Sequence, residues 1–245
     1  MNDTCPCCGA GGLDAGMPLF LLAAHGERGG ATGNARLRAI CREVARLLRG
    51  EAAVRCGVLS GEPSLEGAVA GACESPVSVY PVFMSEGFFV RERLPARLAA
   101  AGVKATVLPV LGADPGFAQA CAARLDGLDG GAPDRVLVAA HGSTRDDRSR
   151  CAAEAFASRL ACALGVAVQC AFLEEQPFVE QAVRALDHRG AIVSLFAGQG
   201  LHGAEDMDAI IAASGFAPDR VIVPADDTVL VARLAAAAFL RAHGR

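Results

Sequence analysis

The sequence contains one structural unit twice, and this duplication limits the possible folds more than any other feature. An apolar run that ends in Ala-Ala-His-Gly gives His25 near the start of the chain and His141 116 positions later. Three further segments recur in the same order at separations of 113 to 115 positions: VRCGVLSGEP with VQCAFLEEQP, VSVYPVFMSEGFF with AIVSLFAGQGLHG, and KATVLPVLGADP with DRVIVPADD. Because four pairs of segments keep nearly one separation, we infer an internal duplication.

Each copy alternates apolar, β-branched runs with helix-like stretches such as residues 34–50 and 150–165. This alternation is typical of parallel strands covered by helices on both faces. We therefore predict an α/β fold of two similar lobes, each with a parallel sheet of about four strands flanked by helices. The segment 126–134 is rich in Gly, Asp and Pro and marks the boundary. The N-terminal lobe is then residues 17–127 and the C-terminal lobe residues 134–245.

Composition excludes several classes of protein. Hydrophobic residues make up 52% of the chain and charged residues 20%, which excludes a disordered chain. The formal net charge is −4 with no basic stripe, which argues against a nucleic-acid partner. No apolar run approaches the roughly 20 residues of a membrane span, and the N-terminus does not have the pattern of a signal peptide. We expect a cytoplasmic protein with no membrane partner, as a monomer or a homodimer.

The first 16 residues contain Cys5, Cys7 and Cys8, whereas the other cysteines are isolated among apolar residues. Isolated free cysteines usually serve as small buried apolar side chains. Thiolates at the spacing of the first three can bind Cu(I), Zn or an Fe–S fragment. Three cysteines without a partner pair do not complete a tetrahedral site. We interpret residues 1–16 as a flexible tail, with a metal-loading arm as the alternative.

Gly198, Gly200 and Gly203 have the G-x-G-x-x-G spacing of a dinucleotide-binding loop. The loop follows a predicted strand and precedes a predicted helix, as that interpretation requires. However, the dinucleotide motif normally belongs to the first strand–helix turn of its domain, and this loop follows the third strand. A nucleotide-binding oxidoreductase therefore remains an alternative.

Polar side chains follow three consecutive predicted strands of the C-terminal lobe: His141, Glu174 and His202. The carboxyl ends of parallel strands lie at one edge of the sheet, where ligands collect. Neutral imidazole suits Fe, Co, Ni and Zn, and a carboxylate can complete the coordination. The pattern favours a metal site at this edge, although a histidine beside glycine is more often a hydrogen-bonded loop residue.

These segments resemble the sirohydrochlorin chelatase family, the CbiX-type class II tetrapyrrole chelatases. The resemblance is carried by AAHGSTRDD at 139–147, FLEEQPFVEQAV at 172–183 and SLFAGQGLHGAEDM at 194–207. It implies two similar lobes that face each other across a cleft. It also implies insertion of Co²⁺ or Fe²⁺ into sirohydrochlorin or a related tetrapyrrole, in cobalamin or sirohaem biosynthesis.

The resemblance also implies roles for particular residues. His141, His202 and Glu174 would bind the metal, and His141 and Glu174 would act in catalysis. Apart from the resemblance, Arg145, Arg148 and Arg150 follow His141 closely, and their side chains could pair with substrate carboxylates; a solvated helix start is the alternative. Gly200 would let the backbone pass beneath the flat macrocycle. The metal ion is then a substrate, and we expect no tightly bound cofactor.

The N-terminal lobe departs from the family pattern. It keeps His25 but has Ser60 in place of the glutamate and Phe89 in place of the second histidine. We therefore interpret residues 17–127 as a degenerate half, in which His25 is the one residue with a possible part in the reaction. A non-catalytic paralogue that binds metal or tetrapyrrole is the second alternative.

Overall fold

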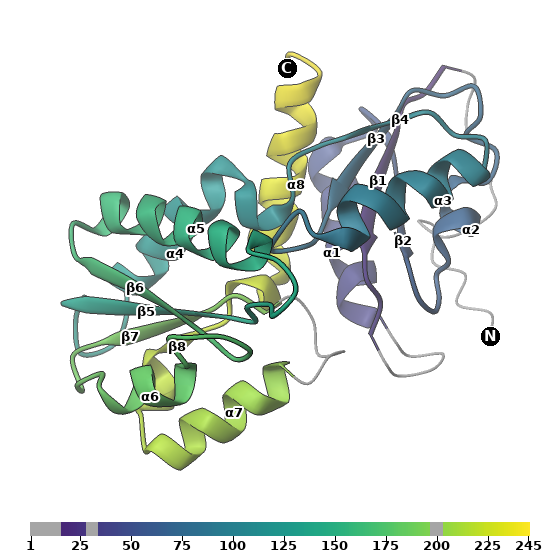
Figure 1. The fold of residues 1–245 in the computed structure, drawn as a ribbon. Helices are drawn as coiled ribbons and strands as arrows, with labels where there is room; N and C mark the ends of the chain where they lie inside the picture. The colour runs from purple at the N-terminus through teal and green to yellow at the C-terminus, as the bar shows by residue number, and fades with distance from the viewer. Residues whose placement is uncertain (1–15, 28–33, 197–202) are drawn as a thin grey trace, which may run out of the picture. The chain divides into compact units, whose positions relative to one another are not determined.

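The computed structural model describes residues 16–27, 34–196 and 203–245. It contains two parallel sheets of four strands each, which confirms the predicted α/β fold of two similar lobes (Figure 1). The first sheet has the order β2-β1-β3-β4 and the second β6-β5-β7-β8. The strands are β1 (Leu19–Ala24), β2 (Ala53–Val58), β3 (Val77–Pro81), β4 (Ala105–Val107), β5 (Arg135–Ala140), β6 (Ala167–Phe172), β7 (Ala191–Ser194) and β8 (Val221–Ile222).

Helices connect the strands, as expected for parallel neighbours, which need crossover connections. The α-helices are α1 (Ala35–Leu48), α2 (Leu65–Val69), α3 (Leu94–Ala100), α4 (Pro115–Asp126), α5 (Arg148–Leu164), α6 (Val179–Arg184), α7 (Gly203–Ser214) and α8 (Thr228–Ala242). Shorter turns are the π-helical η2 (Phe89–Arg93) and the 3₁₀ turns η3 (Leu111–Ala113), η4 (Pro218–Arg220) and η5 (Pro224–Asp226). Among the described residues, no helix combines the length and hydropathy that a membrane span requires.

The central strand of each sheet is buried on both faces, which explains its uninterrupted apolar sequence. Leu19 to Ala23 in β1 are fully buried, and Val136 to Ala139 in β5 are nearly so. In the first sheet, β1 and β3 pack with Leu94 and Leu98 of α3. Each fully buried leucine or valine contributes roughly 1.5–3 kcal/mol relative to an exposed one. The carboxyl ends of β1 and β5 are therefore held in fixed positions.

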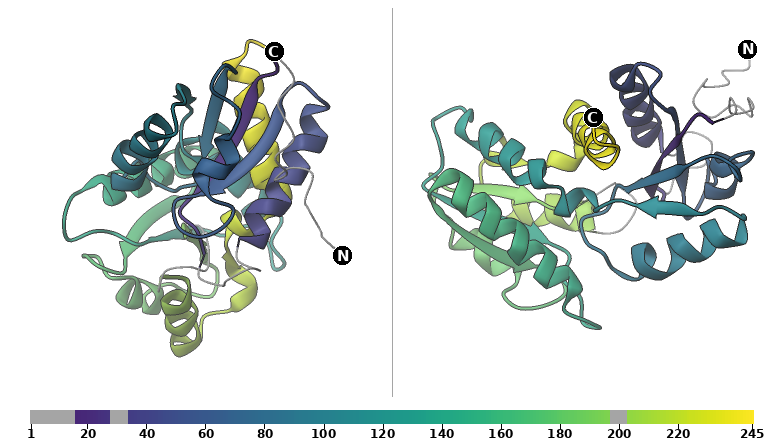
Figure 2. Two further views of the ribbon diagram at one scale, coloured as in Figure 1. Left: turned by 90° about the vertical axis from the view of Figure 1, so that its right-hand side faces the viewer. Right: turned by 90° about the horizontal axis from the view of Figure 1, so that it is seen from above.

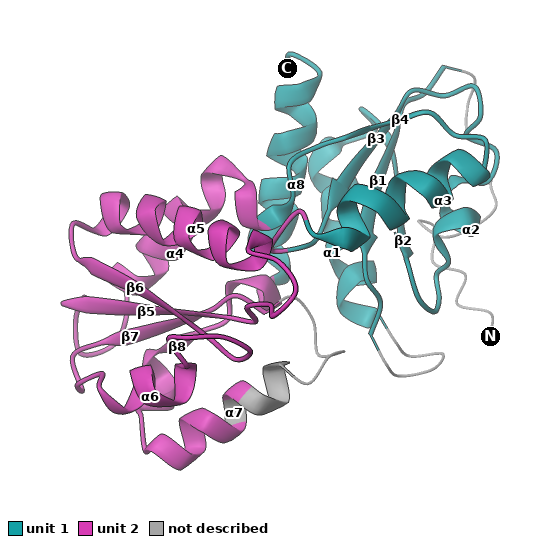
Figure 3. Cartoon of the chain, viewed as in Figure 1, with its two compact units in different colours: residues 1–83, 87–111, 228–245 teal, residues 84–86, 112–227 magenta. Residues whose placement is uncertain are grey.

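The chain forms two compact units whose composition differs from the predicted lobes in one helix each (Figure 3). The first unit comprises residues up to Phe83, together with Gly87–Leu111 and Thr228–Arg245. The second comprises Met84–Glu86 and Gly112–Asp227. The last helix of each sequence copy thus belongs to the unit formed by the other copy.

Aromatic contacts explain this exchange of helices. Phe239 of α8 packs on Phe20 of β1, with ring centroids 4.9 Å apart. Phe117 of α4 packs on Phe156 of α5, with ring centroids 5.4 Å apart. All four rings are fully buried. Figure 2 shows α8 beside α1 from two further directions, both within the first unit.

Candidate metal centre

His141 follows the carboxyl end of β5, the second strand in the order of its sheet. The next residue, Gly142, has φ +75°, which a side chain rarely tolerates. A Cβ at this position would lie 2.9 Å from both the Cβ of Phe172 and the Cγ of Glu175. Glycine therefore lets the turn pass close to the end of β6 and fixes where the His141 imidazole begins.

Glu174 follows β6, the strand that pairs with β5 in parallel. Its backbone N–H donates a hydrogen bond to the carbonyl oxygen of His141 at 3.0 Å. The two side chains then meet, with His141 Nδ1 3.7 Å from Glu174 Oε1. The side chains are 43% and 47% exposed, so solvent reaches both donor atoms. These two residues therefore lie together at the carboxyl edge of the sheet.

The separation of the two donor atoms suits a shared ion. A first-row divalent ion binds nitrogen and oxygen donors at about 2.1 Å, which places two neighbouring ligand atoms about 3.0–3.5 Å apart. The observed distance of 3.7 Å is slightly longer, and a small side-chain rotation would bring the two donor atoms into this range. Both side chains are half exposed, so the surrounding protein leaves room for that rotation.

The third predicted ligand, His202, lies outside the described residues, as do Gly198 and Gly200. Phe196, the last described residue before this gap, lies close to His141, with ring centroids 6.4 Å apart. The described chain resumes at Gly203, where α7 begins. Within the described residues, no three His, Cys, Asp or Glu side chains form a group that could hold a metal ion. The participation of His202 therefore stays a prediction.

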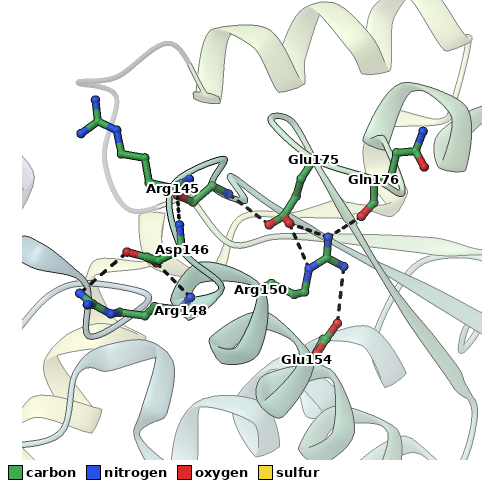
Figure 4. Close-up of polar contacts among 8 residues, drawn as sticks. Arg145, Asp146, Arg148, Arg150, Glu154, Glu175 and Gln176 are labelled. Atoms are coloured by element: carbon green, nitrogen blue, oxygen red, sulfur yellow. Dashed lines mark hydrogen bonds and ion pairs between the residues drawn. The ribbon is translucent and has the colours of Figure 1, made fainter.

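Arg150 is held by protein groups in the structure (Figure 4). Its Nε and Nη2 donate to Glu175 Oε2 at 3.0 and 2.5 Å, and Nη2 also donates to the carbonyl oxygen of Gln176 at 2.6 Å. Its guanidinium carbon lies 4.7 Å from the centre of the Phe172 ring. Hydrogen bonding to Glu175 raises the pKa of Arg150. The guanidinium of Arg150 is therefore occupied by contacts within the protein.

Arg145 differs from Arg150 because its guanidinium forms no ion pair with the described residues. Figure 4 shows its side chain extending away from the neighbouring contacts. The residue is exposed, and its backbone N–H donates to Ser143 Oγ at 3.1 Å. The hydrogen bond to Ser143 therefore holds the backbone of Arg145, and the charged side chain is available to an anionic ligand.

Glu175 is the functional-site residue that the sequence analysis missed. Its Oε1 accepts a hydrogen bond from the backbone N–H of Ser143 at 3.1 Å, and its Oε2 receives Arg150. Two adjacent glutamates in the sequence gave no reason to separate their roles. The structure separates them, because Glu175 turns toward the protein and Glu174 toward His141.

The N-terminal lobe has the same backbone arrangement without the polar pair. The N–H of Ser60 donates to the carbonyl oxygen of His25 at 2.8 Å, as Glu174 does to His141. The His25 ring packs on Phe89, with centroids 4.4 Å apart. Burial lowers the pKa of His25 below its ordinary value of 6.5. The described part of this lobe therefore presents an imidazole against an aromatic ring, with no carboxylate at the Ser60 position.

Comparison with known proteins agrees with this two-lobe arrangement. The family model CbiX matches residues 19–128 and again residues 135–229, which together are most of the chain. The chain belongs to the CbiX family. The two matches also coincide with the two copies recognised in the sequence. No curated protein sequence matches the chain.

Solved structures of CbiX and SirB proteins share the fold. A structure of CbiX, described as the terminal enzyme for biosynthesis of sirohaem in denitrifying bacteria, is 34% identical, with a TM-score of 0.76 over 91% of this chain and 98% of that chain. SirB from Bacillus subtilis with Fe³⁺ is 17% identical, with a TM-score of 0.70 over 93% and 98%. The sirohydrochlorin chelatase SirB from Bacillus subtilis subspecies spizizenii in complex with cobalt is 13% identical, with a TM-score of 0.59 over 93% and 97%. The two SirB structures support the fold alone.

Proposed function

We propose that this CbiX-family protein inserts a divalent metal, Co²⁺ or Fe²⁺, into sirohydrochlorin. The observation that carries the proposal is the pair His141 and Glu174, whose donor atoms lie 3.7 Å apart at the carboxyl edge of a parallel sheet. Family membership supports the choice of reaction, because the CbiX relative at 34% identity is described as the terminal enzyme of sirohaem biosynthesis.

In this proposal the metal ion is a substrate held by a small set of ligands. His141 as neutral imidazole and Glu174 as carboxylate bind it, and His202 provides the third protein ligand. A set of three leaves coordination positions open for the macrocycle nitrogens. The half-exposed positions of His141 and Glu174 fit a site that must receive an ion from solution and release it again.

Metal insertion also requires proton transfer. Two pyrrole N–H protons leave the macrocycle as one M²⁺ enters, so the charge of the macrocycle core is unchanged. Glu174 is the proposed base for the first proton, since its carboxylate is exposed beside the metal-binding imidazole. The second proton passes to water. His141, which holds the metal, and Glu174, which accepts the proton, are therefore the proposed catalytic residues.

The substrate is polycarboxylated, and Arg145 is the proposed partner for one of its carboxylates. Arg145 is exposed and unpaired among the described residues, at a distance of four positions from His141 along the turn. Gly200 remains the proposed position of close approach to the macrocycle. Arg148 lies 3.9 Å from Asp146, a weak surface contact, and is not needed for this assignment.

We also propose that the reaction takes place in the cytoplasm. The seven cysteines described, Cys41, Cys56, Cys73, Cys121, Cys151, Cys162 and Cys170, are all free. Free cysteines in this number are typical of a reducing compartment. Whether the protein acts there as a monomer or a homodimer would be read from its mass in solution.

Single-turnover metallation followed by absorbance tests the proposed function. Purified protein is mixed with sirohydrochlorin and Co²⁺, and wild type is compared with His141→Ala. We expect the mutant to lose most of the rate above the uncatalysed background. His188→Ala is the matched control, because His188 is an exposed histidine of the same lobe. Background rates in all three proteins would refute a chelatase, and equal rates above background would refute the role of His141. Co²⁺ binding without metallation by wild type would favour the non-catalytic paralogue.

A further inference from the structure

In each lobe, hydrogen bonds link the turn after the central strand to the loop that follows the neighbouring strand. We call this set of hydrogen bonds the tie of the lobe. His25–Gly26–Glu27 follows β1 and His141–Gly142–Ser143 follows β5, and the glycines have φ +111° and +75°. In each turn, the backbone N–H after the glycine donates to a side-chain oxygen. The loop after the neighbouring strand also contains a cis peptide bond in each lobe, before Pro63 and before Pro177.

In the N-terminal lobe, one neutral side chain makes the tie. Asn34 Oδ1 accepts from the N–H of Glu27 at 2.9 Å. Its Nδ2 donates to the carbonyl oxygen of Glu62 at 2.9 Å, the residue before the cis proline. Asn34 is 3% exposed, so its side chain is shielded from water, and both bonds are partly buried.

In the C-terminal lobe, an ion pair makes the corresponding tie. Glu175 accepts from the N–H of Ser143, and Arg150 donates both to Glu175 and to the carbonyl oxygen of Gln176. Arg150 stands 116 positions after Asn34, the separation of His25 and His141. Arg150 and Asn34 are therefore equivalent residues that bind equivalent carbonyl groups. The group that binds this carbonyl is charged in the lobe with the His–Glu pair and neutral in the other lobe, where a separate ion pair joins Arg36 Nη2 to Glu27 Oε1 at 2.9 Å.

We propose that Arg150 and Glu175 are positioning residues that hold the His141 turn and Glu174 in the geometry that binds the metal substrate. This inference rests on the proposed function and deepens it. Glu175 is bonded to the turn two residues after His141 and is adjacent to Glu174 in the chain. The tie therefore fixes both ends of the His141–Glu174 pair.

The tie also selects which glutamate binds the metal. Both oxygens of Glu175 have donors, Oε1 from Ser143 and Oε2 from Arg150. The Glu174 carboxylate accepts no hydrogen bond from the part of the chain that the structure describes. Bonds between charged groups are roughly twice as strong as neutral ones. Arg150 thus keeps Glu175 from competing with Glu174 as a ligand.

Co²⁺ titration of the full-length protein tests the inference, with a competing chelator dye as the reporter. Partners that orient metal ligands typically contribute roughly 10–100-fold in metal affinity, so we expect Arg150→Asn to weaken Co²⁺ binding by that factor. Asparagine is the residue that the other lobe has at this position. Arg184→Asn is the matched control, because Arg184 pairs with Glu180 on the exposed face of α6. The control should bind Co²⁺ as wild type does.

Steady-state metallation separates positioning from folding. We expect Arg150→Asn to raise the KM for Co²⁺ and to leave the KM for sirohydrochlorin unchanged. A residue needed only for folding would lower kcat through the folded fraction and change neither KM. If Arg150→Asn does not fold, Glu175→Gln decides by the same measurements, since it keeps an acceptor for Ser143 but weakens the bond to Arg150. Its expected loss is roughly tenfold, the lower end of the range.

Two results would overturn the inference, and they are distinguishable. A folded Arg150→Asn or Glu175→Gln protein with wild-type affinity for Co²⁺ would overturn the positioning role alone. If His141→Ala binds Co²⁺ as tightly as wild type, the proposed function fails, and this inference fails with it.

Discussion

Ser60 and Glu174 occupy equivalent backbone positions in the two lobes, because the N–H of each donates to the carbonyl oxygen of the histidine that follows the neighbouring strand. The side chains differ, and so does what surrounds the histidine. His141 meets a carboxylate, whereas His25 packs against Phe89. The two lobes share this backbone arrangement, and the C-terminal lobe has the side chains that we propose as metal ligands.

This equivalence predicts that the N-terminal lobe can be given a metal site. The double variant Ser60→Glu/Phe89→His restores the family's residues beside His25, and we expect it to bind one more Co²⁺ ion per chain than wild type. Isothermal titration with Co²⁺ measures the number of sites. Ser60→Ala/Phe89→Ala is the control and should bind the same number as wild type. An unchanged number in the first variant would show that the two backbones are not functionally equivalent.

Glu174→Gln should slow metallation while the protein stays folded. Glutamine keeps the size of the side chain and loses the base, and general bases contribute about 100-fold or more to rate. We therefore expect kcat at saturating Co²⁺ and sirohydrochlorin to fall by at least about 100-fold. Glu180→Gln, on the exposed face of α6, should keep the wild-type kcat. Equal kcat values in the two variants would remove Glu174 from the chemistry.

Gly142→Ala should destabilise the protein more than Gly165→Ala. Both glycines have positive φ, +75° and +70°, so both substitutions carry a similar backbone cost of about 1–2 kcal/mol. A Cβ at Gly142 would also lie 2.9 Å from Phe172 and Glu175, whereas Gly165 has no atom within 4 Å. We expect the free energy of unfolding in urea to fall further in Gly142→Ala, with weaker Co²⁺ binding. Equal losses would mean that the turn after His141 has room to move.

His25 should make the fold sensitive to acid. Burial lowers the pKa of His25 in the folded protein below 6.5, so protonation favours the unfolded chain. The contribution of His25 to stability is therefore complete above pH 6.5 and decreases as the pH falls from there toward the lowered pKa. Urea unfolding at pH 7.5 and 5.5 should show a smaller difference in His25→Gln than in wild type. His188→Gln, at an exposed position, should behave as wild type does, and a His25→Gln protein with the wild-type difference would contradict the assignment.

The strands, the lobes and the His141–Glu174 pair could be predicted from the sequence because each depends on local pattern. Buried parallel strands give apolar runs, and the repeat aligns the residues that follow them. The position of α8 could not be predicted in this way, since the repeat aligns it with its own copy. Its packing partner depends on how the Phe239 ring fits against Phe20, which no periodicity records.

The contact between Arg150 and Glu175 could also not be predicted from the sequence. The two residues are 25 positions apart, and Arg150 has the spacing of a residue at an exposed helix start. An arginine near a proposed anion site suggests substrate binding, and no sequence pattern indicates that Glu175 is its partner. The equivalence of Arg150 with Asn34 was the available signal, but its meaning depends on the carbonyl groups that both residues bind.

Anomalous diffraction at the cobalt edge, from crystals of the full-length protein loaded with Co²⁺, tests the proposed metal site most directly. We expect one strong peak within bonding distance of both a His141 imidazole nitrogen and a Glu174 carboxylate oxygen, with His202 as the third protein ligand. A peak elsewhere, with the His141 and Glu174 side chains unliganded, would contradict it.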